Sequence, residues 1–132
     1  MTSGAVPPTT SSSAPRPRRI AAVVCAVEAL AMAGFGIYGL VQLALGQGTD
    51  PARVITESVL ILLFAGGMGL LARLWLGSSS WPGTPTVVWH ALLIPVLIEM
   101  VKAGQWLVSL ALALVIGLAI WAVIAARGTS TE

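Results

Sequence analysis

The chain has 132 residues, of which 57% are hydrophobic and only 9% are charged, whereas soluble domains carry roughly a quarter charged residues. A soluble fold of this size could not hide so much apolar surface, so the composition predicts a protein whose solvent is a lipid bilayer. The net charge of +2 comes without a basic patch of the kind that binds nucleic acid, and the single cysteine, Cys25, has no partner for a disulfide and no metal-ligand spacing around it.

The first 19 residues are rich in Pro, Ser and Thr and contain few apolar side chains. Such a segment cannot bury enough surface to offset the entropy of ordering it. We therefore expect residues 1–19 to form a disordered tail.

Four apolar segments follow the tail. A helix rises 1.5 Å per residue and the hydrocarbon core is about 30 Å thick, so about 20 residues span it. The first segment is longer than the apolar part of a signal peptide, and we expect it to be retained. Pro95 lies inside the third segment, and membrane helices tolerate such a proline where neighbours satisfy the freed carbonyl. The expected spans are about 20–45, 54–76, 86–103 and 106–126, followed by a short C-terminal tail at 128–132.

The links between these segments are short. Asp50 is suited to cap the second helix, with Pro51 at its first position. Only "KAGQ" separates the third and fourth segments, which forces an antiparallel hairpin. The sequence therefore predicts an all-α membrane protein, an up-down bundle of four transmembrane helices over residues 20–127.

Basic residues set the expected orientation. The positive-inside rule places the arginines before the first span in the cytoplasm, and four spans return the C-terminus to that side. We expect both termini to be cytoplasmic in a cell membrane. Five of the seven basic residues then lie inside, namely Arg16, Arg18, Arg19, Arg73 and Arg127, and two lie outside, Arg53 and Lys102. We interpret the tryptophans as interface anchors, with Trp106 toward the outer boundary and the others near the inner one, namely Trp75, Trp81, Trp89 and Trp121.

Glu28 is a carboxylate inside the apolar run "VVCAVEALAMAGFGIYG". It lies nine positions into the first span, about 12–14 Å from the inner boundary. A charge there costs about 2.5–3.5 kcal/mol on insertion scales, so it needs a partner, a proton or a water-filled cavity. Its face of the helix carries polar and small residues, and we expect that face to meet the bundle interior or another subunit; it comprises Glu28, Met32, Phe35, Gly39 and Gln42.

His90 is the candidate partner of Glu28, at about 6 Å from the same boundary. The two side chains could share one proton, because histidine titrates near physiological pH. The pair is therefore a candidate proton site or a candidate interhelical hydrogen bond, and the sequence leaves both interpretations open.

Glu99 and Lys102 form an i,i+3 pair at the outer end of the third span, a candidate ion pair at the interface. Two glycine clusters, 34–39 and 66–69, are expected to let helices approach closely. No catalytic constellation, cofactor motif or metal-ligand spacing can be placed in an aqueous loop, so we expect no enzyme activity, cofactor or metal.

The stretch "HALLIPVLIEMVKAGQWLVSLALALVIGL", together with the basic Pro-rich tail, resembles small four-span integral membrane proteins of actinobacteria whose role is unassigned. That resemblance implies membrane location and no activity. The chain also resembles small multidrug resistance transporters, which are four-span proteins with an essential first-span glutamate, although their aromatic pattern is missing here. Two hypotheses follow. The first is a structural or accessory membrane subunit that packs against a partner complex, with Glu28 and His90 as interhelical links. The second, which the resemblance to small multidrug resistance transporters implies, is an oligomeric proton-coupled transporter with Glu28 as its coupling carboxylate. The expected partners are the lipid bilayer and either further copies of the chain or another membrane protein, and not nucleic acid.

Overall fold

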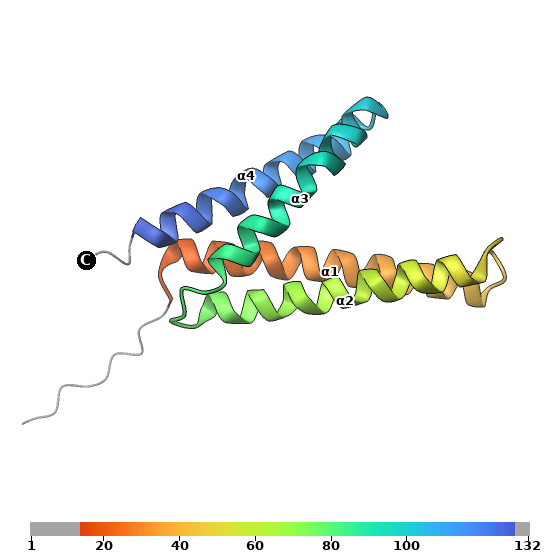
Figure 1. Ribbon diagram of the computed structural model, residues 1–132, viewed down its shortest axis with the longest axis horizontal. Coiled ribbons are helices and arrows are strands. Elements are labelled where there is room, and N and C mark those ends of the chain that lie inside the picture. The colour runs from red at the N-terminus through yellow and green to blue at the C-terminus, as the bar shows by residue number, and fades with distance from the viewer. Residues whose placement is uncertain (1–13, 129–132) are drawn as a thin grey trace, which may run out of the picture.

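A computed structural model describes residues 14–128 of the chain (Figure 1). The described part is all-α and contains no strand. Each helix is long and apolar enough to cross a membrane. Their bounds are α1 Arg16–Ala44, α2 Pro51–Leu76, α3 Gly83–Lys102 and α4 Trp106–Gly128.

The start of α2 follows the predicted chemistry. The backbone N–H of Arg53 donates to Asp50 Oδ1 at 3.1 Å, and Pro51 occupies the first helical position. The start of α3 was predicted three residues too late, at 86, because Pro85 was assigned to the link. Proline is tolerated in a first turn, where backbone N–H groups have no partner within the helix.

The start of α1 also differs from the prediction. The helix begins at Arg16, so residues 16–19 are helical and are not part of a disordered tail. Pro17 lies in the first turn, and the carbonyl of Pro15 accepts hydrogen bonds from the N–H groups of Arg18 and Arg19. Residues 1–13 of the predicted N-terminal tail and residues 129–132 of the C-terminal tail lie outside the described part.

The four helices form two antiparallel hairpins, which confirms the predicted up-down order. In Figure 1, α1 lies along α2, and α3 lies along α4. The hairpins meet where α1 begins and α4 ends, and they diverge toward the other end. We call these the joined end and the open end. Both ends of the described chain lie at the joined end.

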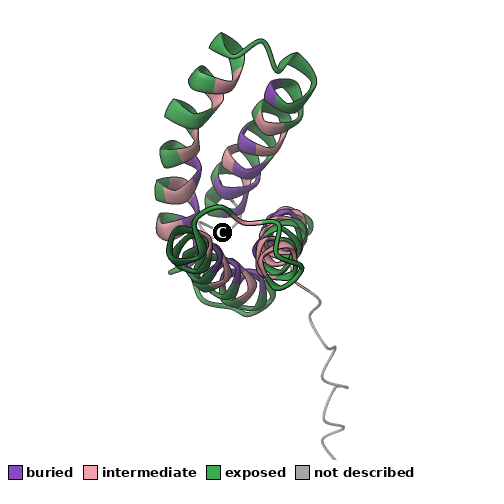
Figure 2. Cartoon of the chain, turned by 90° about the vertical axis from the view of Figure 1, so that its right-hand side faces the viewer, coloured by how far each residue is buried: buried purple, intermediate pink, exposed green. Residues whose placement is uncertain are grey.

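Small side chains form the core at the joined end. Ala21, Cys25, Ala122 and Val123 are almost completely buried there and pack around Trp75. Figure 2 shows the buried residues on the faces that the helices turn toward one another. Small residues allow such close helix packing in a membrane, where no hydrophobic force drives helices together.

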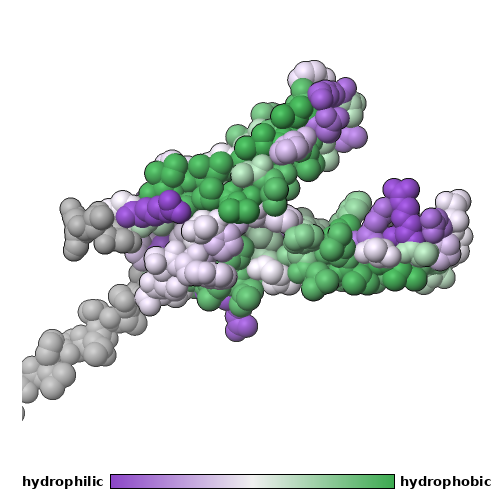
Figure 3. Space-filling model, viewed as in Figure 1, coloured by the Kyte–Doolittle hydropathy of each residue, from purple (hydrophilic) through white to green (hydrophobic). Residues whose placement is uncertain are grey.

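The remaining surface is strongly apolar. Leu30, Leu63 and Leu107 are 74%, 70% and 85% exposed, and Figure 3 shows hydrophobic surface along both hairpins with hydrophilic residues gathered mainly toward the helix ends. Leaving so many apolar side chains in water would be costly, whereas lipid tails are as apolar as leucine. The fold is compatible with a multi-pass membrane protein.

Two glycines of α1 allow close contact with α2. A Cβ atom on Gly36 would lie 2.9 Å from Leu62 Cγ and 3.2 Å from the Ser58 carbonyl, and one on Gly39 would lie 2.6 Å from Ser58 Oγ. The predicted close packing is confirmed at these positions. Gly34 and Gly66 have no such neighbour within 4 Å.

Gly36→Ala is expected to lower the free energy of unfolding by about 1–2 kcal/mol, because the added methyl group must push against a backbone carbonyl as well as a side chain. Gly34→Ala is the matched control in the same helix. It should leave stability unchanged or raise it by up to about 1 kcal/mol through helix propensity. Reversible unfolding in mixed micelles measures both changes, and equal effects at the two positions would contradict the close-packing argument.

Candidate functional site

The structure brings the two predicted polar residues together. Glu28 in α1 and His90 in α3 lie with Oε1 and Nε2 3.1 Å apart. The His90 side chain is completely buried and the Glu28 side chain is 13% exposed. Because α1 and α3 belong to different hairpins, this contact ties the hairpins to each other.

A second contact fixes the state of the histidine ring. His90 Nδ1 lies 2.7 Å from the carbonyl oxygen of Thr86, one turn earlier in α3. A carbonyl only accepts hydrogen bonds, so Nδ1 carries a proton. One further proton then joins Nε2 to Glu28, either as a carboxyl group that donates to the imidazole or as an imidazolium that donates to the carboxylate. The geometry therefore holds one proton between the two side chains.

The second carboxylate oxygen has a different environment. Glu28 Oε2 is buried and has no hydrogen-bond partner among residues 14–128. A buried acceptor without a donor is uncommon in folded proteins and calls for a specific explanation. Here it marks the position where the site has capacity for one more donor.

The structure places both residues well inside their helices. His90 is seven residues from the start of α3, or about 10 Å along the axis, and Glu28 is twelve residues from the start of α1, or about 18 Å. Their distances from the membrane boundary stay predictions.

A hydrogen-bond chain that the sequence did not reveal connects this pair to α2. Trp75 Nε1 donates to Thr86 Oγ1 at 3.0 Å, and the Thr86 hydroxyl donates to the Pro82 carbonyl at 2.7 Å. Trp75 is only 2% exposed. Its predicted role as an interface anchor was therefore wrong, because its indole N–H has a partner inside the protein.

Arg18 extends the chain to the end of α2. Its Nε donates to the Trp75 carbonyl at 3.2 Å, and its Nη2 lies 2.6 Å from each of the carbonyls of Gly77 and Ser79. Its guanidinium carbon lies 5.2 Å from the centre of the Trp75 ring. The last carbonyls of a helix lack partners within it, and Arg18 donates to one of them, that of Trp75, and to two carbonyls just beyond the helix end.

Together these contacts form a closed polar loop through three helices. Arg18 of α1 binds Trp75 of α2, Trp75 binds Thr86 of α3, Thr86 binds His90, and His90 binds Glu28 back in α1. The loop crosses the joined end, where the hairpins meet. Among residues 14–128, the side-chain hydrogen bonds of this loop are the ones that link α2 and α3 to α1.

Glu99 and Lys102 also lie together, but far from this loop. Lys102 Nζ donates to Glu99 Oε1 at 2.8 Å, and both side chains are largely exposed at the open end of α3. Arg53 and Glu57 form a similar pair on α2, at 2.6 Å. Exposed pairs of this kind contribute about 0–1 kcal/mol.

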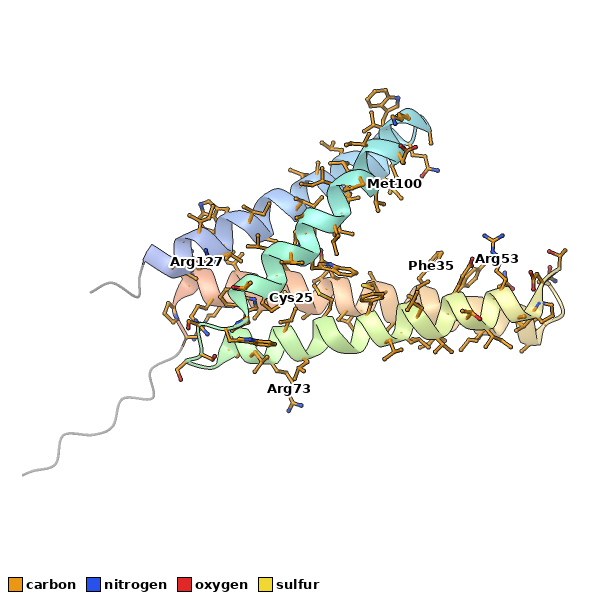
Figure 4. All side chains as sticks on the ribbon, viewed as in Figure 1. Cys25, Phe35, Arg53, Arg73, Met100 and Arg127 are labelled. Carbon is orange, nitrogen blue, oxygen red and sulfur yellow. The ribbon has the colours of Figure 1, made fainter. Side chains whose placement is uncertain are left out.

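The predicted interior face of α1 is interior only in part. Phe35 is 68% exposed, and Figure 4 shows it on the side of α1 that faces the space between the hairpins. Phe35 does not pack in the interior of the single chain, because the hairpins diverge beyond Glu28; the predicted alternative, contact with another subunit, stays a prediction. Nearer the open end, Gln42 Nε2 donates to the Tyr38 hydroxyl of the same helix at 2.6 Å.

No group of three or more His, Cys, Asp or Glu side chains close enough to hold a metal occurs among residues 14–128. No protein-family model matches the chain, and no curated protein or solved structure matches it either. The site therefore has to be interpreted from its own geometry.

Proposed function

We propose that this multi-pass membrane protein is a structural or accessory subunit that acts by packing against a partner in the membrane. The observation that carries the proposal is the Glu28–His90 contact. The carboxyl group that a transporter would present to its substrate is here hydrogen-bonded to a completely buried histidine of the other hairpin. That is the arrangement expected of an interhelical link.

The divergence of the hairpins supports the same proposal. The polar loop holds them together at the joined end, and toward the open end the faces that the two hairpins turn to each other move apart (Figure 1). A protein that completes its packing on a partner needs such faces. This role requires no catalysis, in line with the resemblance to four-span actinobacterial membrane proteins.

We further propose that both termini are cytoplasmic in the cell membrane of a bacterium. Five of the seven basic residues belong to the joined end, and short loops rich in arginine are retained on the cytoplasmic side.

Proton-coupled transport is the second candidate, and one observation favours it. The Thr86 carbonyl fixes the imidazole so that Glu28 and His90 share a single proton, as a coupling site would. Four helices of 20–29 residues enclose little space, so transport would require at least a dimer.

Crosslinking in the native membrane, gentle detergent extraction and mass spectrometry separate the two candidates. A foreign subunit in fixed stoichiometry is the result expected of an accessory protein. A pure homo-oligomer would contradict that role. Proteoliposomes would then be assayed for proton release on ligand addition that Glu28→Gln abolishes.

A further inference from the structure

A groove runs along the lipid-facing side of the first hairpin, close to the joined end. It has a volume of about 460 Å³ and lies between α1 and α2. Two of the α1 residues that line it, Val23 and Leu30, are exposed and lie on the side of α1 opposite to Glu28, which contacts the second hairpin. The groove therefore opens away from the second hairpin. Its wall is apolar except at one position, Arg73 of α2.

Two arginines belong to the side of the first hairpin on which this groove lies. Arg73 lines the groove, and Arg19 lies four residues before Val23, on the same face of α1. Both side chains are exposed and neither has a hydrogen bond or ion pair to any residue in the range 14–128. Arg18, by contrast, is turned inward and fully engaged.

The position of Arg73 makes the lack of a hydrogen-bond or ion-pair partner among residues 14–128 significant. It lies three residues before the last residue of α2, about 4.5 Å from the helix end, within the apolar surface. Figure 4 shows its side chain pointing away from the hairpin, and Figure 3 shows a hydrophilic group at that place beside hydrophobic surface. A guanidinium at this depth reaches for the interface and is stabilised by an anion there.

We infer that this groove binds an anionic glycerophospholipid, with its phosphate between Arg19 and Arg73 and one acyl chain along the groove. Guanidinium groups bind phosphate oxygens in bidentate fashion, and the apolar wall offers no donor or acceptor that an acyl chain would leave unpaired. From Val23 to Leu30 the wall extends about 10 Å along the helix. A helix of a second copy packed here would bury the Arg73 charge without an anion, which disfavours that occupant. This inference does not depend on the role of Glu28.

Native mass spectrometry of the full chain, released from nanodiscs with equal amounts of phosphatidylglycerol and phosphatidylcholine, tests the site. We expect retained phosphatidylglycerol to exceed phosphatidylcholine by about tenfold or more, since each basic residue near a membrane surface contributes about fivefold toward anionic lipid. Arg19→Gln and Arg73→Gln should each reduce the preference about fivefold. Val23→Trp, which fills the groove from an exposed position, should lower retention of the lipid while leaving both arginines in place.

Arg53→Gln is the matched control, because it removes one positive charge at the open end and leaves the groove intact. It should keep the full preference for phosphatidylglycerol. Equal retention of the two lipids by the unaltered chain would overturn the site, and so would an undiminished preference in the Arg19→Gln/Arg73→Gln double variant. Lipid-free dimers would overturn it as well, since a second copy would then be the occupant of the groove.

Discussion

Replacing Arg18 with methionine is expected to lower the free energy of unfolding by about 3–4 kcal/mol. The buried carbonyl of Trp75 loses a charged donor, which costs about 1.5–3 kcal/mol. The partly buried carbonyls of Gly77 and Ser79 can recover water, so their loss adds less. The contact between the guanidinium and the Trp75 ring contributes about 1 kcal/mol more. Reversible unfolding in mixed micelles, followed by tryptophan fluorescence, measures the sum.

Arg19→Met is the control for this experiment, because Arg19 is the next residue, carries the same charge and is exposed. It should change stability by less than about 0.5 kcal/mol. Arg18→Lys keeps the charge that directs membrane insertion but cannot reach three carbonyls with one ammonium group, so it should still lose about half of the stability difference. If Arg18→Met and Arg19→Met destabilise equally, Arg18 serves only as a topogenic charge.

The helices could be predicted because their signals are local. Apolar runs of about 20 residues, the Asp50–Pro51 start of α2 and the short link before α4 are each contained in a short stretch of sequence. The errors at the starts of α1 and α3 also have a local cause. Prolines 17 and 85 suggested irregular chain, whereas a first helical turn accepts proline without losing a hydrogen bond.

The roles of Arg18 and Trp75 could not be predicted, because their partners are distant in sequence. Arg18 binds carbonyls 57 to 61 residues away, and its identity and position fit a positive-inside charge equally well. The sequence position of Trp75 likewise fits an interfacial anchor, and only the tertiary structure places Thr86 beside its indole N–H. The divergence of the hairpins is also a property of tertiary packing that no apolar pattern contains.

The Glu28–His90 contact could be predicted although its two residues are distant in sequence, and the bilayer explains why. In water a glutamate has countless partners, but in an apolar segment it needs one of the few polar groups at similar depth. His90 is the only histidine of the chain and lies in another apolar segment, which leaves few other candidates. The sequence did not indicate Thr86, whose backbone carbonyl and hydroxyl both take part in the site, because a threonine in a helix commonly bonds only within its own helix.

His90→Leu is expected to lower the free energy of unfolding by about 3 kcal/mol, because it leaves the largely buried Glu28 carboxyl group without its partner. Glu28→Gln should stay within about 1 kcal/mol of the unaltered protein, because the glutamine amide can donate to His90 Nε2 where the shared proton now lies. Adding Glu28→Leu to His90→Leu should restore about 1 kcal/mol of stability, because both polar partners are then removed together. The same micelle unfolding experiment reports all three values.

These variants also distinguish a contribution of the Glu28–His90 pair to stability from a role of its shared proton in a proton-coupled activity. If the Glu28→Gln protein is stable and assembles normally but loses a proton-coupled activity, the shared proton has a functional role. A Glu28→Gln protein with altered assembly and no such activity would make the pair an assembly contact, as the hydrogen bond between the two hairpins suggests. If His90→Leu and Glu28→Gln both leave stability, assembly and activity unchanged, the contact has neither role. The chain of hydrogen bonds would then end at Thr86, and the hairpins would be held together by the small-residue core and the Trp75–Thr86 hydrogen bond.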